Sequence, residues 1–313
     1  MKQSFTCLDP DGDVELILRR PNFHGIVEPP PVEDPNAFEQ QVASLASLVF
    51  PSQDDSNEWK PFKEDGSDTE IEIRASSSHL CLASPVFRKM LRGEWKESQR
   101  SSTGMHRVIA EEWNARAFII VLDIIHGHHR TLPRSVPLEL LAKIAAISNY
   151  YACEEIVEVF GGAWHARLPR VLPTFLSKDF EPRLNINYVF GQWVQAMHLA
   201  QTALMGSEKP IIMPNSPVPD AIFTAIEDKR IITFKKVLLS LKKLEDSLCT
   251  STRCTPDCCA LLLGSLMKQR HEKQLALLKK PFHGYSIDWL KKTIGTFVTP
   301  AIVSTACAYV GAT

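Results

Sequence analysis

The chain has 313 residues, of which 44% are hydrophobic and 23% are charged, and its formal net charge is −1. This composition is globular, the length suits two ordinary domains, and the near-zero charge gives no general attraction to nucleic acid or membranes. No apolar stretch long enough to span a bilayer and no basic, apolar leader is seen, so the eight cysteines are expected to be thiols in the cytoplasm or nucleus.

The first ordered element is a predicted strand over residues 13–18, where Val14, Leu16 and Leu18 share one face. The pattern then stops, because residues 21–68 contain seven of the 21 prolines and residues 21–70 contain eleven acidic residues against two lysines. A proline-rich, acidic stretch buries too little apolar surface to form a core. We interpret 21–68 as a long mobile insertion between two paired strands, with one short helix expected over 36–50.

The most informative stretch of the sequence begins with an alternating strand pattern at 70–74. A serine run, His79 and a short helical segment follow, and Ser84-Pro85 then starts a second helix. Serine is a good helix cap and proline has its φ already set, so both residues favour a helix start. In that helix Phe87 and Met90 are expected to face the core.

The pattern continues with a strand at 106–110 and a helix capped by Asn114. This helix is apolar around most of its circumference, so it is expected to be central in the fold. Pro137 fits the first turn of the following helix. A further helix is predicted over 154–160, with Gly161-Gly162 as its stop.

This order of elements resembles that of the BTB/POZ domain family over about residues 10–165. The residues that support the resemblance are His79, at the start of the first short helix, and the Ser84-Pro85-Val86-Phe87 step at the start of the second. The acidic insertion and the helical second half are similar to those of fungal BTB proteins. In many members of the family a basic residue next to the histidine that corresponds to His79 helps to line a charged pocket, which has roles that include recruiting corepressors. Leu80 stands at that position here, which argues against such a role for this chain.

The resemblance implies an α+β domain, a small sheet with surrounding helices, at 10–168. An all-α domain is expected at 183–295 and a tail at 296–313. Within the α-helical half, apolar spacing predicts helices over 186–205, 221–248 and 258–278. Asp220 stands at the cap position of the second of these helices.

Two groups of residues have metal-ligand character. His126-Gly-His-His129 has no fourth ligand nearby. Cys249, Cys254, Cys258 and Cys259 lie within eleven residues and could surround zinc, although known zinc sites usually use two separated pairs. The alternative is that these thiols pack a helix junction. No cofactor is therefore expected.

A run of basic residues without an intervening acid extends from 229 to 243. It could contact phosphates, an acidic partner or the acidic insertion, or form the solvated face of an amphipathic helix. The basic residues are Lys229, Arg230, Lys235, Lys236, Lys242 and Lys243.

Three functions are compatible with these patterns. The resemblance implies a protein-interaction module, either a homodimer or an adaptor or scaffold for a cullin-type ubiquitin ligase. A dimer would place its seam near the first short helix, and an adaptor would use the second helix, the loop at 93–104 and the helices after Pro137. The alternatives are a transcription-associated regulator and an enzyme on an unrecognised fold, although nucleotide, nucleophile-elbow and zinc-protease motifs are absent. The candidate interface residues are His79, Leu80, Leu82, Ser84, Pro85, Val86, Phe87 and Met90.

Overall fold

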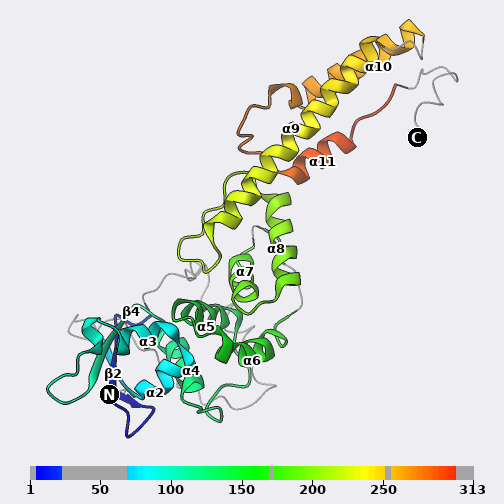
Figure 1. The fold of residues 1–313 in the computed structure, drawn as a ribbon. Helices are drawn as coiled ribbons and strands as arrows, with labels where there is room; N and C mark the ends of the chain where they lie inside the picture. The colour runs from blue at the N-terminus through cyan, green and yellow to red at the C-terminus, as the bar shows by residue number, and fades with distance from the viewer. Residues whose placement is uncertain (1–4, 23–68, 170–172, 176, 251–254, 301–313) are drawn as a thin grey trace. The chain divides into compact units, whose positions relative to one another are not determined.

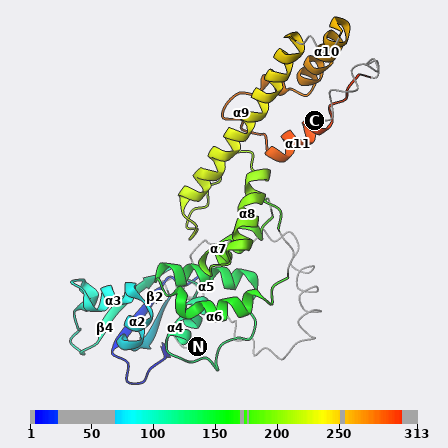
Figure 2. The same cartoon turned by 45° about the vertical axis from the view of Figure 1, so that its right-hand side comes forward.

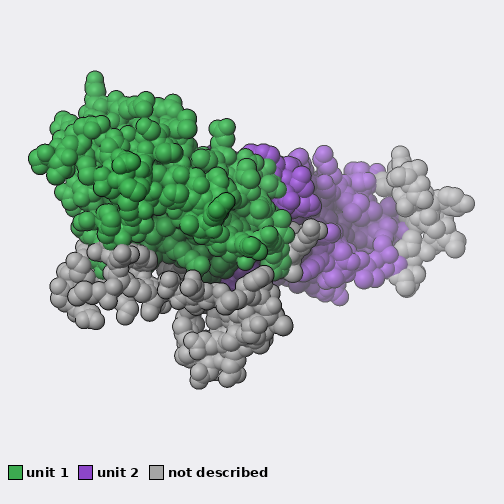
Figure 3. All heavy atoms as spheres, turned by 90° about the horizontal axis from the view of Figure 1, so that it is seen from below, with its two compact units in different colours: residues 1–170, 185–192, 215–217 green, residues 171–184, 193–214, 218–313 purple. Residues whose placement is uncertain are grey.

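The computed structural model describes residues 5–22, 69–169, 173–175, 177–250 and 255–300. The chain divides into two compact units, which Figure 3 shows in different colours. Apart from residues 21 and 22, the expected insertion lies outside the described residues, as does most of the expected tail. Unit 1 comprises residues 1–170, 185–192 and 215–217, and unit 2 comprises residues 171–184, 193–214 and 218–313.

Unit 1 contains a mixed four-stranded sheet in the order β1-β3-β2-β4 (Figure 1). Strand β2 pairs antiparallel with β3 and parallel with β4, and β1 pairs parallel with β3. The predicted pairing of the two strands that flank the insertion is therefore confirmed, whereas β1 was not predicted. The strands are β1 (Phe5–Cys7), β2 (Val14–Arg19), β3 (Glu70–Ala75) and β4 (His106–Glu111).

Alternation along the strands gives the sheet one apolar face, because successive side chains point to opposite sides. Leu16, Ile73 and Val108 are fully buried on that face and belong to the main core. The opposite face carries charges in register, where Arg19 lies beside Glu70 with 2.8 Å between Nε and Oε1.

Five helices of unit 1 pack around this sheet. Helix α4 is buried along eight of its residues, which confirms its predicted central position. The side chain of Asn114 caps it by accepting a hydrogen bond from the Ala117 amide at 3.0 Å. Helices α5 and α6 pack together and against α4 (Figure 2). The helices are α2 (Ser77–Ala83), α3 (Pro85–Arg92), α4 (Ala115–Ile125), α5 (Leu138–Tyr150) and α6 (Glu154–His165).

The predicted stop at Gly161-Gly162 is wrong, because α6 continues to His165. Gly161 instead permits a close approach, since a Cβ there would lie 2.7 Å from the ring of Phe190. Pro137 immediately precedes α5 and is its cap residue, not part of its first turn.

Unit 2 is built from helices in its described residues, so the expected fold class, a small α+β sheet domain with a helical second half, is confirmed. Helix α7 contributes residues to both units. The single helix predicted over 186–205 is wrong, because Gly191 takes a φ of +63° between α7 and α8. The helices are α7 (Phe180–Val189), α8 (Trp193–Gly206), α9 (Asp220–Thr250), α10 (Pro256–Glu272) and α11 (Ile287–Gly295).

The core of unit 2 forms where α9 packs against α10, α11 and the loop before α11. Phe234 is fully buried there and stacks on Phe282 with ring centroids 5.0 Å apart.

Helix α10 ends at Glu272, earlier than predicted, and Gln274 follows in a left-handed conformation with φ of 58°. Asp220 is the first residue of α9, not the residue before it. None of the described helices has the length and apolar content needed to cross a bilayer.

Candidate protein-interaction surface

The Ser84-Pro85 step forms the junction between α2 and α3. Ser84 is fully buried, and its hydroxyl oxygen accepts a hydrogen bond from the Phe87 amide at 3.0 Å. The same hydroxyl donates to the backbone carbonyl of Tyr151. Phe87 stacks on the Tyr151 ring with centroids 4.4 Å apart. The start of α3 is therefore fixed to the residue that follows α5.

The other predicted interface residues separate into buried and exposed sets. Leu80 is 0% exposed and belongs to the core, whereas Leu82 on the same helix is 81% exposed. Val86 and Met90 are partly buried and pack against the core. Pro85 is exposed. Of the apolar side chains on α2, Leu82 is therefore the one that is available to a partner.

His126 orders the start of α2. Its Nε2 accepts a hydrogen bond from the Ser76 amide at 3.0 Å, so its Nδ1 carries the proton and donates to the Leu122 carbonyl at 2.8 Å. Burial lowers the pKa of His126, which keeps the ring neutral. His79 is exposed, with its ring centroid 5.3 Å from that of His126.

Neither predicted group of metal-ligand character forms a cluster in the part of the chain that the structure describes. Both ring nitrogens of His126 are already hydrogen-bonded, and His129 packs on Phe160 with centroids 4.9 Å apart. Cys254 lies outside the described residues. Cys249 is exposed near the end of α9, whereas Cys258 and Cys259 are buried in the first turns of α10.

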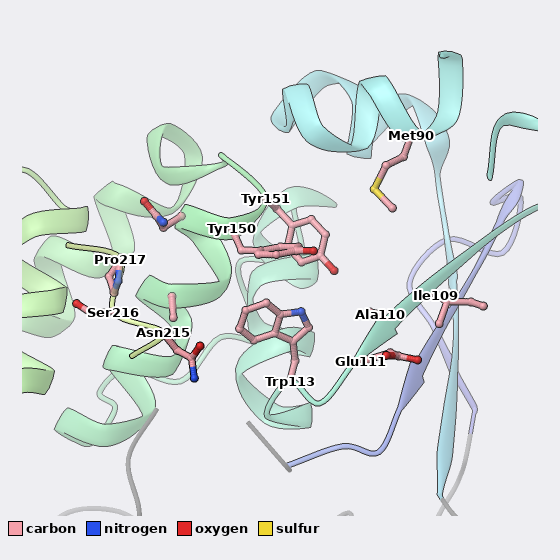
Figure 4. Close-up of a pocket in the computed structure, with 12 residues that line it drawn as sticks. Met90, Ile109, Ala110, Glu111, Trp113, Tyr150, Tyr151, Asn215, Ser216 and Pro217 are labelled. Carbon is pink, nitrogen blue, oxygen red and sulfur yellow. The ribbon is translucent and has the colours of Figure 1, made fainter. Parts of the chain in front are cut away.

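A groove with a volume of about 560 Å³ opens on unit 1 where α3, β4 and the end of α5 meet (Figure 4). Two large side chains at this groove are exposed, Ile109 by 41% and Tyr150 by 61%. Met90 comes to it from α3 and Glu111 from the end of β4. The groove is therefore lined by both apolar side chains and polar groups, among them the Glu111 carboxylate and the Asn149 amide.

Aromatic rings form the interior of this groove. The Trp113 ring meets the Tyr150 ring edge-on with centroids 5.2 Å apart and lies 6.4 Å from that of Tyr151. Trp113 and Tyr151 are buried, and burial raises the pKa of the Tyr151 phenol, so its hydroxyl stays protonated at neutral pH. A rigid, buried aromatic base below two exposed side chains is a typical setting for an interaction hot spot.

A segment distant in sequence completes the groove. Asn215, Ser216 and Pro217 line it, and the Ser216 hydroxyl donates to Oδ1 of Asn185 at 2.7 Å. The sequence places these residues in a proline-rich break between helices, and no local pattern indicates their position. Trp113, Tyr150 and Ile109 were likewise missed. Ile109 and Tyr150 lie on the exposed sides of β4 and α5, and Trp113 lies between β4 and α4, so none of them contributes to the apolar periodicity of an element.

Unit 1 thus combines a small mixed sheet with surrounding helices, and its groove has an aromatic interior. Residues 67–162 match the family model of the BTB/POZ domain, so this chain carries a BTB/POZ domain, as the sequence order predicted. No curated protein matches the chain. BTB/POZ domains are protein-interaction modules.

Proposed function

We propose that the protein is an adaptor and that its partner binds the groove between α3, β4 and the end of α5. The observation that carries this proposal is the exposure of Ile109 and Tyr150 above the buried Trp113 and Tyr151. Aromatic anchors of this kind dominate binding energies, because they bury much area at a small entropy cost. The proposed partner is the scaffold subunit of a cullin-type ubiquitin ligase.

The surface expected for an adaptor from sequence overlaps this groove. Met90 of α3 and Tyr150 of α5 both line it, and Trp95, in the loop after α3, is 64% exposed. Met90 and Tyr150 belong to helices whose other faces are buried in the core, so these two side chains are held in place before a partner arrives. Such preorganisation lowers the entropy cost of binding.

The test is calorimetric titration of the full chain with the N-terminal domain of a cullin scaffold. Ile109→Glu and Tyr150→Ala should each weaken binding by about tenfold or more, as expected for hot-spot residues. Val159→Glu is the matched control, because Val159 is 75% exposed on α6 and does not line the groove. Equal affinity in all variants, or no binding by the unmodified chain, would contradict the proposal.

Homodimerisation is the second candidate, and it is favoured by the 81% exposure of Leu82 on α2. BTB dimers usually bury this helix, so Leu82 would lie in the seam. Light-scattering mass of the full chain at low and high salt tests it. A dimer that Leu82→Asp converts to a monomer at both salt concentrations would support this candidate, and a monomer throughout would exclude it.

We further propose a non-enzymatic role in the cytoplasm or nucleus. The support is that BTB/POZ domains form a protein-interaction family and that enzyme motifs are absent from the sequence. A transcription-associated role would require a nucleic-acid-binding element, for which the basic run of α9 is the candidate. Imaging of a fluorescent fusion, with and without nuclear export blocked, tests the location.

A further inference from the structure

The basic run of α9 does not form one surface. Arg230 is fully buried, and its guanidinium donates to the carbonyls of Pro281, Phe282 and Tyr285 and to the carboxylate of Glu227. The prediction that Arg230 belongs to a solvated or phosphate-binding face is therefore wrong. The other five basic residues of the run are exposed, namely Lys229, Lys235, Lys236, Lys242 and Lys243.

The exposed side of α9 has a seven-residue repeat. Ala225, Ile232 and Leu239 follow one another at intervals of seven, so they form a single column along the helix. Ile232 is 47% exposed and Leu239 is 56% exposed. Large apolar side chains rarely stand in line on a solvated helix face unless another element covers them.

Lysines flank this apolar column. Lys229, Lys236 and Lys243 repeat at the same interval of seven, four residues after each column position. Lys235 and Lys242 stand on the other side, three residues after Ile232 and Leu239. Because residues three and four positions apart are neighbours on a helix surface, these lysines lie on both sides of the apolar column.

The column lies on the side of α9 opposite its packed face. Phe223, Phe234 and Leu241 are buried on the packed face, together with Arg230. At 100° per residue, Ile232 is about half a turn from Phe234 around the helix axis. The apolar column is therefore available at the surface of unit 2.

The column continues into a groove between α8 and α9. This groove has a volume of about 750 Å³, and Ile222, Ala225 and Lys229 line it from α9. Met197, which is 72% exposed, and Leu204 line it from α8. The lining is mainly apolar, so the column and the groove form one surface, which we call the α8–α9 face.

The lysines of the α8–α9 face are poorly compensated. Within the described part of the chain, Lys229, Lys236 and Lys243 form no ion pair, whereas Lys242 is 3.1 Å from a carboxylate oxygen of Asp246. The side-chain interaction with Lys280 lowers the pKa of Lys235, as expected when two positive groups lie close together.

We propose that the α8–α9 face binds an amphipathic helix of a partner protein, one with an apolar heptad column bordered by Glu or Asp. The lysine columns complement such a helix, and the groove accommodates its apolar residues at one end. A second copy of this chain would place lysine against lysine. The apolar column is one residue wide, too narrow for insertion into a membrane surface, and it carries no aromatic ring for stacking nucleic-acid bases.

The test uses the full chain and a fluorescent synthetic helix of about three heptads, with Leu at the column positions and Glu on both flanks. A matched peptide has Lys in place of Glu. Fluorescence anisotropy should show binding of the Glu peptide alone, weaker at high salt. The double variant K236E/K243E and the single variant Ile232→Asp should each weaken it about tenfold. The control K209E/K291E changes two exposed lysines outside the face and should bind as the unmodified chain does.

Several results would overturn the proposal. One is equal affinity for the Glu and Lys peptides, or an affinity that K236E/K243E leaves unchanged. Another is that phosphatidylserine vesicles or single-stranded RNA bind through these lysines while the Glu peptide does not. A third is a dimer, measured by light scattering, that Ile232→Asp dissociates. All substitutions are at exposed positions, and circular dichroism checks that the variants fold. The proposal concerns unit 2 and is independent of what binds the groove of the BTB unit.

Discussion

Ser84 and Tyr151 are joined by a buried hydrogen bond from the serine hydroxyl to the tyrosine carbonyl. Because the same hydroxyl also caps α3, one side chain sets both the start of that helix and its position against the end of α5. Met90 of α3 and Tyr151 are thereby brought to the same groove. Ser84, a capping residue that can be recognised in the sequence, thus also helps to position the side chains of the proposed interaction site.

Replacing Ser84 by alanine should remove both hydrogen bonds and leave a buried carbonyl unpaired. The lost cap costs about 1 kcal/mol and the unpaired carbonyl about 1–3 kcal/mol of unfolding free energy. Urea denaturation followed by tryptophan fluorescence measures the loss. Ser98→Ala changes a serine whose hydroxyl bond is exposed and should alter stability by less than about 0.5 kcal/mol. An equally small change in the Ser84 variant would contradict the proposed role.

Replacing Gly161 or Gly162 by alanine is predicted to change the stability of the protein in opposite directions. Alanine at 161 would place its Cβ 2.7 Å from the ring of Phe190, which is 1% exposed and has little room to move, so the variant should be destabilised by about 1–3 kcal/mol. Alanine at 162 meets no atom within 4 Å and should stabilise α6 by about 0.5–1 kcal/mol. Thermal unfolding compares the two variants. A gain in stability from Gly161→Ala would show that the helix does not pack closely on Phe190.

Arg230→Met should destabilise unit 2 by about 3–5 kcal/mol, because it leaves the Glu227 carboxylate and three backbone carbonyls without their buried donor. Hydrogen exchange of the loop at 280–286 should increase at the same time. Lys236→Met, on the exposed side of the same helix, is the control and should stay within about 0.5 kcal/mol of the unmodified chain. Similar stabilities for the two variants would contradict this assignment.

Stability should depend on pH through His126. Burial lowers its pKa in the folded state below the ordinary value of 6.5, so the unfolded chain binds the proton more readily. The contribution of His126 is therefore complete above about pH 6.5 and is lost as the pH falls from that value toward the folded-state pKa. Denaturant midpoints between pH 5 and 8 should show this loss, and His126→Gln should reduce it. His271→Gln, at an exposed site on α10, should retain the full pH dependence.

Local signals allowed much of the fold to be predicted. The alternation of β2, β3 and β4 and the caps at Ser84 and Asn114 depend on neighbouring residues, and the structure confirms them. Strand β1 was missed because three residues are too short to show a period. The basic run predicted an exposed Arg230, whereas the spacing of the apolar residues indicates a buried one. Its interval of seven after Phe223 and four before Phe234 puts it on the buried face.

The candidate site was harder to predict, because it depends on contacts between distant parts of the chain. His126 reaches the start of α2 across 50 positions of sequence. Residues 215–217 join the groove from beyond α8. Neither of these long-range contacts produces a periodic pattern in the sequence. The sequence indicated α3 and α5 as elements of a partner surface, and the aromatic side chains between them became apparent only in the structure.

Hydrogen–deuterium exchange of the full chain, alone and saturated with the N-terminal domain of a cullin scaffold, tests the central claim most directly. The groove between α3, β4 and the end of α5 should gain protection, most clearly in the backbone around Ile109 and Tyr150. Protection confined to α2 around Leu82, or no protection in the BTB unit under saturating conditions, would contradict the claim that this groove is the site of partner binding.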